Sequence, residues 1–277
     1  VLLIIDCNLI VLISTLLKIN LNIMKKIILL LIIAVTISCK NESKKEVKKA
    51  ETNLVKKENF PEELGKVFEK HGGIKAWRNA KLLSFNKGEE IHTSDLQTRD
   101  IVIKSPTYSL GFDGKEVWLD EAEEGSFKGN KDFYYNLYFY FYAMPFVLAD
   151  DGITYQKVDD LVFEETNYPG FKISYKANVG TSPDDNYVVY YNPKTYQMEW
   201  LAYTVTFKSK SPSDSYKIIK YNKWENVNGL VLPKEITWYL KDENGTPTKP
   251  AKPATEFTLS LVSQGKLDAS FYAKPKK

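Results

Sequence analysis

The residues best suited to chemistry lie in the string HTSD at 92–95, followed by Arg99. In an extended strand His92 and Ser94 share one face while Asp95 points to the other, a geometry unsuited to a Ser-His-Asp relay. No string resembles a nucleophile elbow. The cluster is therefore interpreted as a polar strand end. Its functional alternative is Arg99 gripping the carboxylate or phosphate of a headgroup.

The remaining titratable residues form no catalytic or metal-binding pattern. His71 and His92 are the two histidines of the chain, and they lack the short spacing of paired metal ligands. The string SPDDN at 182–186 lacks the EF-hand pattern and is interpreted as a turn. Adjacent carboxylates are interpreted as solvated turn charges; they lie at 89–90, 150–151, 159–160 and 184–185. We therefore expect no metal, no cofactor and no enzyme activity. An envelope enzyme that uses His92 or a carboxylate pair is the weaker alternative.

The N-terminal part carries signals for export and anchoring. From Met24 a basic start, an apolar run and small residues lead to Cys39, which predicts a signal peptide at 24–38. The approach to Cys39 resembles the lipobox of bacterial lipoproteins and predicts lipidation there; an uncleaved membrane anchor is the alternative. Residues 1–23 are interpreted as a mis-called upstream extension. The polar stretch after Cys39 predicts a flexible tether, so that 39–59 is anchor and tether and 60–277 is one domain.

Charge and cysteine content limit the class of protein. The whole chain has a formal net charge of +3, but residues 60–277 contain 28 basic and 30 acidic residues. A nearly neutral domain does not fit nucleic-acid binding. Cys7 lies in the doubtful N-terminal extension, so Cys39 is the one cysteine expected in the mature chain. We therefore expect the fold to be held by its hydrophobic core and not by disulfides.

The stretch 131–150, KDFYYNLYFYFYAMPFVLAD, is the one around which the domain is organised. Nine of the seventeen residues at 132–148 are Phe or Tyr. A helix that is apolar on every side is buried all round, and Pro145 predicts a bend. The stretch therefore either fills the interior as a plug or lines a cavity as a lid. Buried Tyr hydroxyls need partners, which a cavity holding water or a ligand headgroup would supply.

Strands dominate the rest of the domain. From Leu82 on, apolar and polar residues alternate between turn signals, for example Asp113-Gly114 and Asn228-Gly229. Such alternation gives an antiparallel sheet with one wet and one dry face. The helical pieces 60–80 and 131–149 can cover the dry face. The predicted fold class is α+β, mainly β: a single curved antiparallel sheet, an open half-barrel, with helices across its concave face.

Five strings carry a family resemblance: HGGIKAW (71–77), GFDGKEVWLD (111–120), YPGFKISYKA (168–177), YYNPKTYQMEWLAYT (190–204) and YNKWENVNGLVLPKEITWY (221–239). Taken with Cys39, they resemble an uncharacterised family of lipoproteins from Gram-negative bacteria. That family is similar in strand and turn order to the periplasmic lipoprotein-carrier (Lol-type) half-barrel superfamily. The resemblance implies a half-barrel with a helical lid over an apolar cavity that receives acyl chains, and it brings no catalytic residue. Soluble carriers of that type are not lipid-anchored, whereas this chain carries the signal at Cys39.

Together these inferences predict a membrane-anchored periplasmic lipoprotein that binds an apolar or amphipathic, lipid-like ligand and is not an enzyme. Cys39 would hold it to the outer membrane, on the periplasmic face. Arg99 would bind a headgroup, and the residues expected to line the cavity are Trp118, Tyr138, Phe141, Tyr142, Met144, Phe146 and Trp238. The alternative is an envelope structural or protein-interaction module with a filled aromatic core, no ligand and a protein partner on its outer surface.

Overall fold

The computed structural model describes residues 60–175 and 185–276, which belong to one compact unit, Glu58–Lys277. The predicted segments 1–23, 24–38 and 39–59 lie outside the described residues, as does most of the SPDDN turn. Within the described ranges, no helix combines the length and the apolar character needed to cross a membrane.

Two short helices open the described part of the chain. They are α2 (Glu62–Lys70) and α3 (Ile74–Asn79). Gly72 lies between them with a φ of 106°, and a Cβ at this position would lie 2.2 Å from the carbonyl oxygen of Gly229. Only glycine meets both requirements. The two helices are thereby packed directly against the turn at Asn228-Gly229.

The first sheet contains six antiparallel strands in the order β14-β1-β2-β3-β4-β5. The bounds of its first five strands along the chain are β1 Leu82–Lys87, β2 Glu90–Asp95, β3 Ile101–Lys104, β4 Tyr108–Phe112 and β5 Val117–Glu121. Gly111 of β4 lies opposite Trp118 of β5, and a Cβ at Gly111 would lie 2.4 Å from Cζ2 of Trp118. The glycine therefore leaves the space that the indole ring occupies on this face of the sheet.

The second sheet follows the order β12-β11-β10-β9-β8-β7-β6, again with antiparallel neighbours. Its strands are β6 Ile153–Phe163, β7 Thr166–Tyr175, β8 Asn186–Tyr191, β9 Met198–Tyr203, β10 Lys217–Val227, β11 Leu230–Lys241 and β12 Pro247–Pro250. The predicted turn at Asn228-Gly229 joins β10 to β11 through two residues, with φ values of 51° and 88°. Positive φ at both positions is what a tight hairpin of this kind requires.

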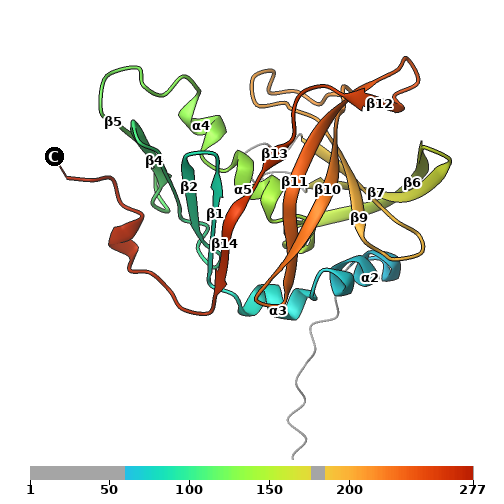
Figure 1. Cartoon of the computed structure of the whole chain (residues 1–277), viewed down its shortest axis with the longest axis horizontal. Helices are drawn as coiled ribbons and strands as arrows, with labels where there is room; N and C mark the ends of the chain where they lie inside the picture. Colours follow the sequence, from blue (N-terminus) through green and yellow to red (C-terminus); the bar gives the residue numbers. More distant parts are fainter. Residues whose placement is uncertain (1–59, 176–184, 277) are drawn as a thin grey trace, which may run out of the picture. The chain divides into compact units, whose positions relative to one another are not determined.

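The last strands of the chain join the two sheets. β13 (Thr255–Glu256) pairs with β11, and β14 (Thr258–Ser263) pairs with β1. Phe257 between them is fully buried, and its N–H donates to the carbonyl of Lys234 at 2.9 Å. The two sheets thus curl into one open antiparallel half-barrel, in which β13 and β14 (red) lie between β1 and β11 (Figure 1). The predicted fold class is confirmed.

The aromatic stretch forms short helices on the concave side. α4 (Lys131–Tyr134) and α5 (Leu137–Tyr142) are followed by a cis Met144–Pro145 bond and the 3₁₀ turn η1 (Phe146–Ala149). The Asn130 side chain accepts a hydrogen bond from the N–H of Phe133 at 3.1 Å and caps α4. Figure 1 shows α4 and α5 between the two flanks of the half-barrel. The predicted single short helix before Pro145 is therefore divided in two.

Candidate functional site

Most of the predicted cavity residues lie in the protein's own core. Phe141, Tyr142, Met144 and Phe146 are at most 3% exposed. The Tyr142 ring stacks on Phe85 with 4.0 Å between centroids, and Phe146 stacks on Trp77 at 4.9 Å. Their neighbours are protein side chains. In this conformation α5 and η1 fill the concavity, as a plug does.

Two phenol groups of the main core find partners within the protein. Tyr142 Oη donates to Ser260 Oγ at 2.6 Å, and Tyr221 Oη donates to the carbonyl of Phe141 at 2.9 Å. Burial raises the pKa of both phenols, so both remain protonated donors. The expected source of partners, water or a ligand headgroup, is therefore not needed for these two side chains.

A buried carboxylate fastens the plug to the sheet. Glu90 accepts hydrogen bonds from Tyr134 Oη at 2.9 Å to each oxygen, from His92 Nε2 at 3.0 Å, and from Tyr108 Oη. Lys87 Nζ lies 2.8 Å from the same carboxylate. These five residues are called the Glu90 node. The node ties α4 to the β1–β2 hairpin through the hydroxyl of Tyr134.

The electrostatics of the Glu90 node favour the ionised carboxylate. Burial alone would raise the pKa of Glu90, but hydrogen bonds from His92, Lys87 and Tyr108 outweigh it and lower the pKa to about 2. Burial lowers the pKa of His92, which therefore acts as a neutral donor. The interpretation of Glu90 as a solvated turn charge was wrong, since its side chain is only 12% exposed. No pattern in the sequence links it to a tyrosine 44 positions away.

The remaining two concave residues of the prediction lie at the open end. Tyr138 and Trp238 are partly buried and pack on Phe141, at centroid distances of 6.2 and 5.7 Å. Trp238 Nε1 donates to Tyr203 Oη at 2.9 Å. Tyr138, Tyr203 and Trp238 are called the mouth cluster. Tyr203 belongs to the buried core, and Tyr138 and Trp238 pack against that core with part of their surface exposed.

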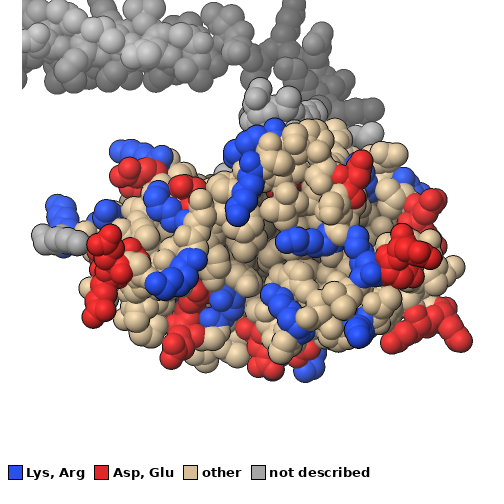
Figure 2. All heavy atoms as spheres, turned by 90° about the horizontal axis from the view of Figure 1, so that it is seen from above, with Lys and Arg blue, Asp and Glu red and all other residues tan. Residues whose placement is uncertain are grey.

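A pocket of about 420 Å³ lies beside the mouth cluster. It is called the mouth pocket and is lined by Asn130, Phe133, Val205, Phe207, Lys208, Ser213, Ser215 and Lys217. The rings of Phe133 and Phe207 contact each other at 5.3 Å, so the apolar part of the lining comes from α4 and from the segment after β9. Figure 2 looks down on the molecule from above Figure 1 and shows Lys and Arg side chains around a largely uncharged middle, with acidic side chains mainly towards the two sides.

Trp118 is not part of this site. It packs with Val102 and Tyr272 in a separate cluster, and its Nε1 donates to the carbonyl of Tyr272 at 2.9 Å. Its strand neighbours Val117 and Leu119 face the main core instead. The predicted cavity position of Trp118 is therefore corrected: the ring lies outside the main core, and the C-terminal segment covers this part of the first sheet.

Arg99 is also occupied. Its Nη2 lies 2.8 Å from both carboxylate oxygens of Asp150, and its guanidinium lies 5.1 Å from the centroid of Phe139. Burial raises the pKa of Asp150, and Arg99 opposes that shift. The protein's own carboxylate therefore engages Nη2 of Arg99, while Nη1 has no hydrogen-bond partner among the described residues. The headgroup role of Arg99 stays a prediction. A second pocket of about 330 Å³ adjoins this pair and is lined in part by Trp77 and Phe146.

The two histidines and Asp95 have structural partners, whereas the hydroxyl of Ser94 is buried without one. His71 Nδ1 donates to the carbonyl of Val231 at 2.9 Å, which leaves Nε2 to accept from Gln197 at 2.8 Å and from the N–H of Met198 at 3.2 Å. Burial is the main cause that lowers the pKa of His71 to about 4. Asp95 accepts from two backbone N–H groups of the following turn. Across residues 60–175 and 185–276, no three His, Cys, Asp or Glu side chains are grouped to hold a metal ion.

Solved structures similar to this chain share little sequence with it. A LolA superfamily protein from Nitrosomonas europaea is 8% identical, with a TM-score of 0.37, over 75% of this chain and 96% of its own. A DUF1329 family protein from Desulfovibrio piger is 9% identical, with a TM-score of 0.39, over 75% and 95%. A domain named for outer membrane lipoprotein sorting from Vibrio parahaemolyticus is 9% identical, with a TM-score of 0.32, over 74% and 96%. Similarities of this size carry no functional argument.

Sequence families give a firmer result. No curated protein matches the chain. The model of a family of unknown function, DUF6503, matches residues 25–246, which contain all five strings of the expected resemblance. The predicted membership of an uncharacterised family is confirmed, and the chain belongs to DUF6503.

Proposed function

We propose that this chain is a non-catalytic, membrane-anchored binding protein for an amphipathic, lipid-like ligand, and that the ligand is held in the mouth pocket. The anchor would be the lipidated Cys39, and the location the periplasmic face of the outer membrane. The sequence signals at 24–39 support the anchor.

The observation that carries the proposal is the lining of the mouth pocket. Its volume of about 420 Å³ lies within the range of small-molecule sites, about 300–1,000 Å³. Phe133, Val205 and Phe207 offer apolar surface, while Lys208 and Lys217 stand among serines and an asparagine. A site with one apolar wall and one polar rim fits an amphipathic ligand, which has an apolar chain and a polar headgroup.

The filled interior supports binding at the mouth rather than in the core. Opening the concavity would expose Phe141, Tyr142, Met144 and Phe146. Burial of each apolar side chain of this kind stabilises the folded state by about 1.5–3 kcal/mol. The Glu90 node would also have to release Tyr134. A ligand that binds beside the mouth cluster requires neither the exposure of these core side chains nor the release of Tyr134.

Titration with a dansyl-labelled fatty acid tests the proposal, with native mass spectrometry of the same mixture to count bound molecules. We expect saturable uptake by the folded domain and about tenfold weaker uptake by Phe207→Ser, because that change removes one wall of the pocket. Leu261→Ser is the matched control, since Leu261 is 50% exposed and its neighbour Val262 faces the core. Absence of uptake, or equal loss in both variants, would contradict the proposal.

The interaction-module alternative has its own support in apolar residues on the first sheet. Ile91, Leu259 and Leu261 are 45%, 78% and 50% exposed, and they come from β2 and β14. These strands lie on either side of β1, and an exposed apolar patch on one sheet is a feature of protein contact surfaces. This alternative predicts no fatty-acid uptake by a fully folded protein, so the same titration separates the two functions.

A further inference from the structure

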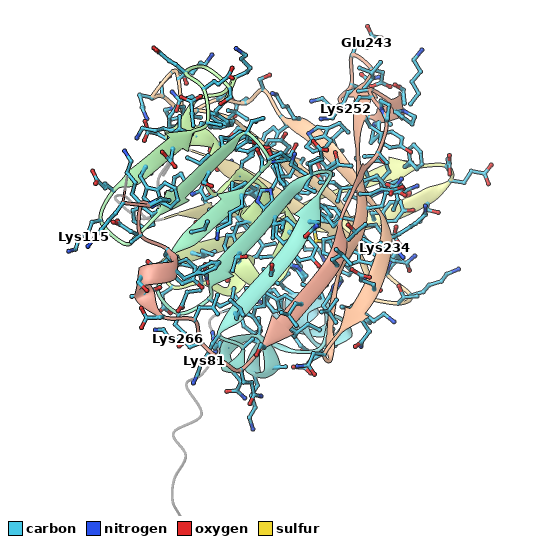
Figure 3. All side chains as sticks on the ribbon, turned by 60° about the vertical axis from the view of Figure 1, so that its left-hand side comes forward. Lys81, Lys115, Lys234, Glu243, Lys252 and Lys266 are labelled. Carbon is cyan, nitrogen blue, oxygen red and sulfur yellow. The ribbon has the colours of Figure 1, made fainter. Side chains whose placement is uncertain are left out.

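Lysines gather at the mouth in direct contact with aromatic rings. Lys252, in the segment between β12 and β13, has its Nζ 3.6 Å from the centroid of Trp238. Lys87 Nζ lies 4.5 Å from the centroid of Tyr138. Figure 3 shows Lys252 at the upper end of the second sheet, near Glu243 and far from Lys115 and Lys266. Two of the three rings of the mouth cluster therefore carry an ammonium group on their faces.

A chain of contacts links Lys252 to the mouth pocket. Lys217, which lines the pocket, is the register partner of Tyr203 on β9. Tyr203 accepts the hydrogen bond of Trp238, whose ring lies under Lys252. Ile219 and Tyr221 face the core, so Lys217, two residues before Ile219, belongs to the concave side of β10. The two amines thus border the same aromatic surface.

The two lysines differ from Lys87 in having no carboxylate of their own. Lys87 is paired with Glu90 at 2.8 Å, whereas neither Lys217 nor Lys252 forms an ion pair with any residue that the structure describes. Burial lowers the pKa of Lys252, and the charges of Lys87 and Lys217 lower it further. Asp185, whose charge acts on Tyr203, already accepts two hydrogen bonds from Thr206. The ammonium groups of Lys217 and Lys252 therefore give the mouth an excess of positive charge, which a bound anion would neutralise.

We infer that the ligand of the mouth pocket is an anionic amphiphile, whose carboxylate or phosphate is bound between Lys217 and Lys252 while its chain lies along Phe133, Val205 and Phe207. The inference rests on the proposed function and adds the charge of the ligand to it. The aromatic ring beneath Lys252 holds the ammonium in place, and bringing an anion to it removes the repulsion between the two amines.

Three probes of equal chain length test the inference by calorimetric titration of the folded domain: dodecanoate, dodecyl phosphate and the uncharged dodecanoyl glycerol, each below its micelle concentration. We expect the two anions to bind about tenfold more tightly than the glycerol ester, since one charge-assisted contact is worth at least that factor. The double variant Lys217→Gln/Lys252→Gln should lose about tenfold for the anions and less than about twofold for the ester. Lys252→Arg should retain the preference, because it keeps the charge.

Lys115→Gln/Lys234→Gln is the matched control, because it removes two exposed lysines that Figure 3 places away from Lys252. Equal affinity of the ester and the anions, or equal loss in the control variant, would overturn the inference and leave the proposed function standing. Failure of all three probes to bind would overturn both. Displacement of dodecanoate by inorganic phosphate, as effective as by dodecyl phosphate, would overturn the amphiphile and indicate a free-anion site.

Discussion

Replacing the carboxylate of the Glu90 node is the sharpest test of how the plug is held. Glu90→Gln keeps the size of the side chain but removes the charge that Lys87, His92, Tyr108 and Tyr134 surround. We expect the domain to fold and to have a lower free energy of unfolding at neutral pH. This loss of stability should arise from the contacts of the carboxylate with Lys87, His92, Tyr108 and Tyr134.

The pKa of Glu90 gives the size of the effect. It falls from 4.5 to about 2, and each pKa unit corresponds to about 1.4 kcal/mol. The ionised carboxylate therefore contributes about 3 kcal/mol to the free energy of unfolding at pH 7. A folded-state pKa below the unfolded one means that this contribution is complete above pH 4.5 and is lost as the pH falls towards 2. At pH 3 the wild type should retain only about 1 kcal/mol of it.

Urea unfolding followed by tryptophan fluorescence measures the difference, provided that the slope with urea is unchanged. The gap between wild type and Glu90→Gln should be about 3 kcal/mol at pH 7 and about 1 kcal/mol at pH 3. Glu89→Gln is the control, since Glu89 is exposed and adjacent and should give a gap near zero at both pH values. The reasoning is refuted if the two variants are equally stable at pH 7, or if the Glu90→Gln gap does not narrow in acid.

Three further predictions concern the core, the outer face and the helix contact. Phe146→Ala should lower the free energy of unfolding by about 3–5 kcal/mol in the same urea assay, because the ring is fully buried against Trp77. Gly111→Ala should lower the free energy of unfolding by about 1–3 kcal/mol, since the new Cβ would lie 2.4 Å from Trp118. The displaced indole should also change the near-UV circular dichroism. His71, with its pKa lowered from 6.5 to about 4, should make the wild type lose about 3 kcal/mol as the pH falls from 6.5 to 4. A His71→Gln variant that shows the same loss over this pH range would refute that assignment.

The architecture was predictable because the signals for it are local. Alternation along each strand and the turns at Asp113-Gly114 and Asn228-Gly229 depend on neighbouring residues only. The aromatic density of 131–150 likewise predicted a buried helical element, and its burial follows from composition alone. The sequence did not indicate the break between α4 and α5, which falls at residues with no Pro or Gly.

The site was less predictable because it depends on distant partners. Alternation shows that Trp118 points away from Val117 and Leu119, but it cannot show which side is the interior, and here both sides are covered. Tyr272, 154 positions later, supplies the second cover. Arg99 and Asp150 are 51 positions apart, and neither stands out as half of a pair. The mouth pocket combines residues from α4 and from the segment that leads from β9 into β10, which only the folded half-barrel brings together.

The segment that joins the two sheets, β13 and β14, is made after both of its partner strands, β11 and β1. Both flanks are synthesised earlier, and β1 can pair with its second neighbour only after β14 has been made, when Ser84 comes to lie opposite Leu261. Until then β1 and β11 present open edges, which can pair with other chains. Pairing across so many residues is also slow compared with local contacts. A premature stop after Pro250 would therefore leave the two halves without the strands that join them.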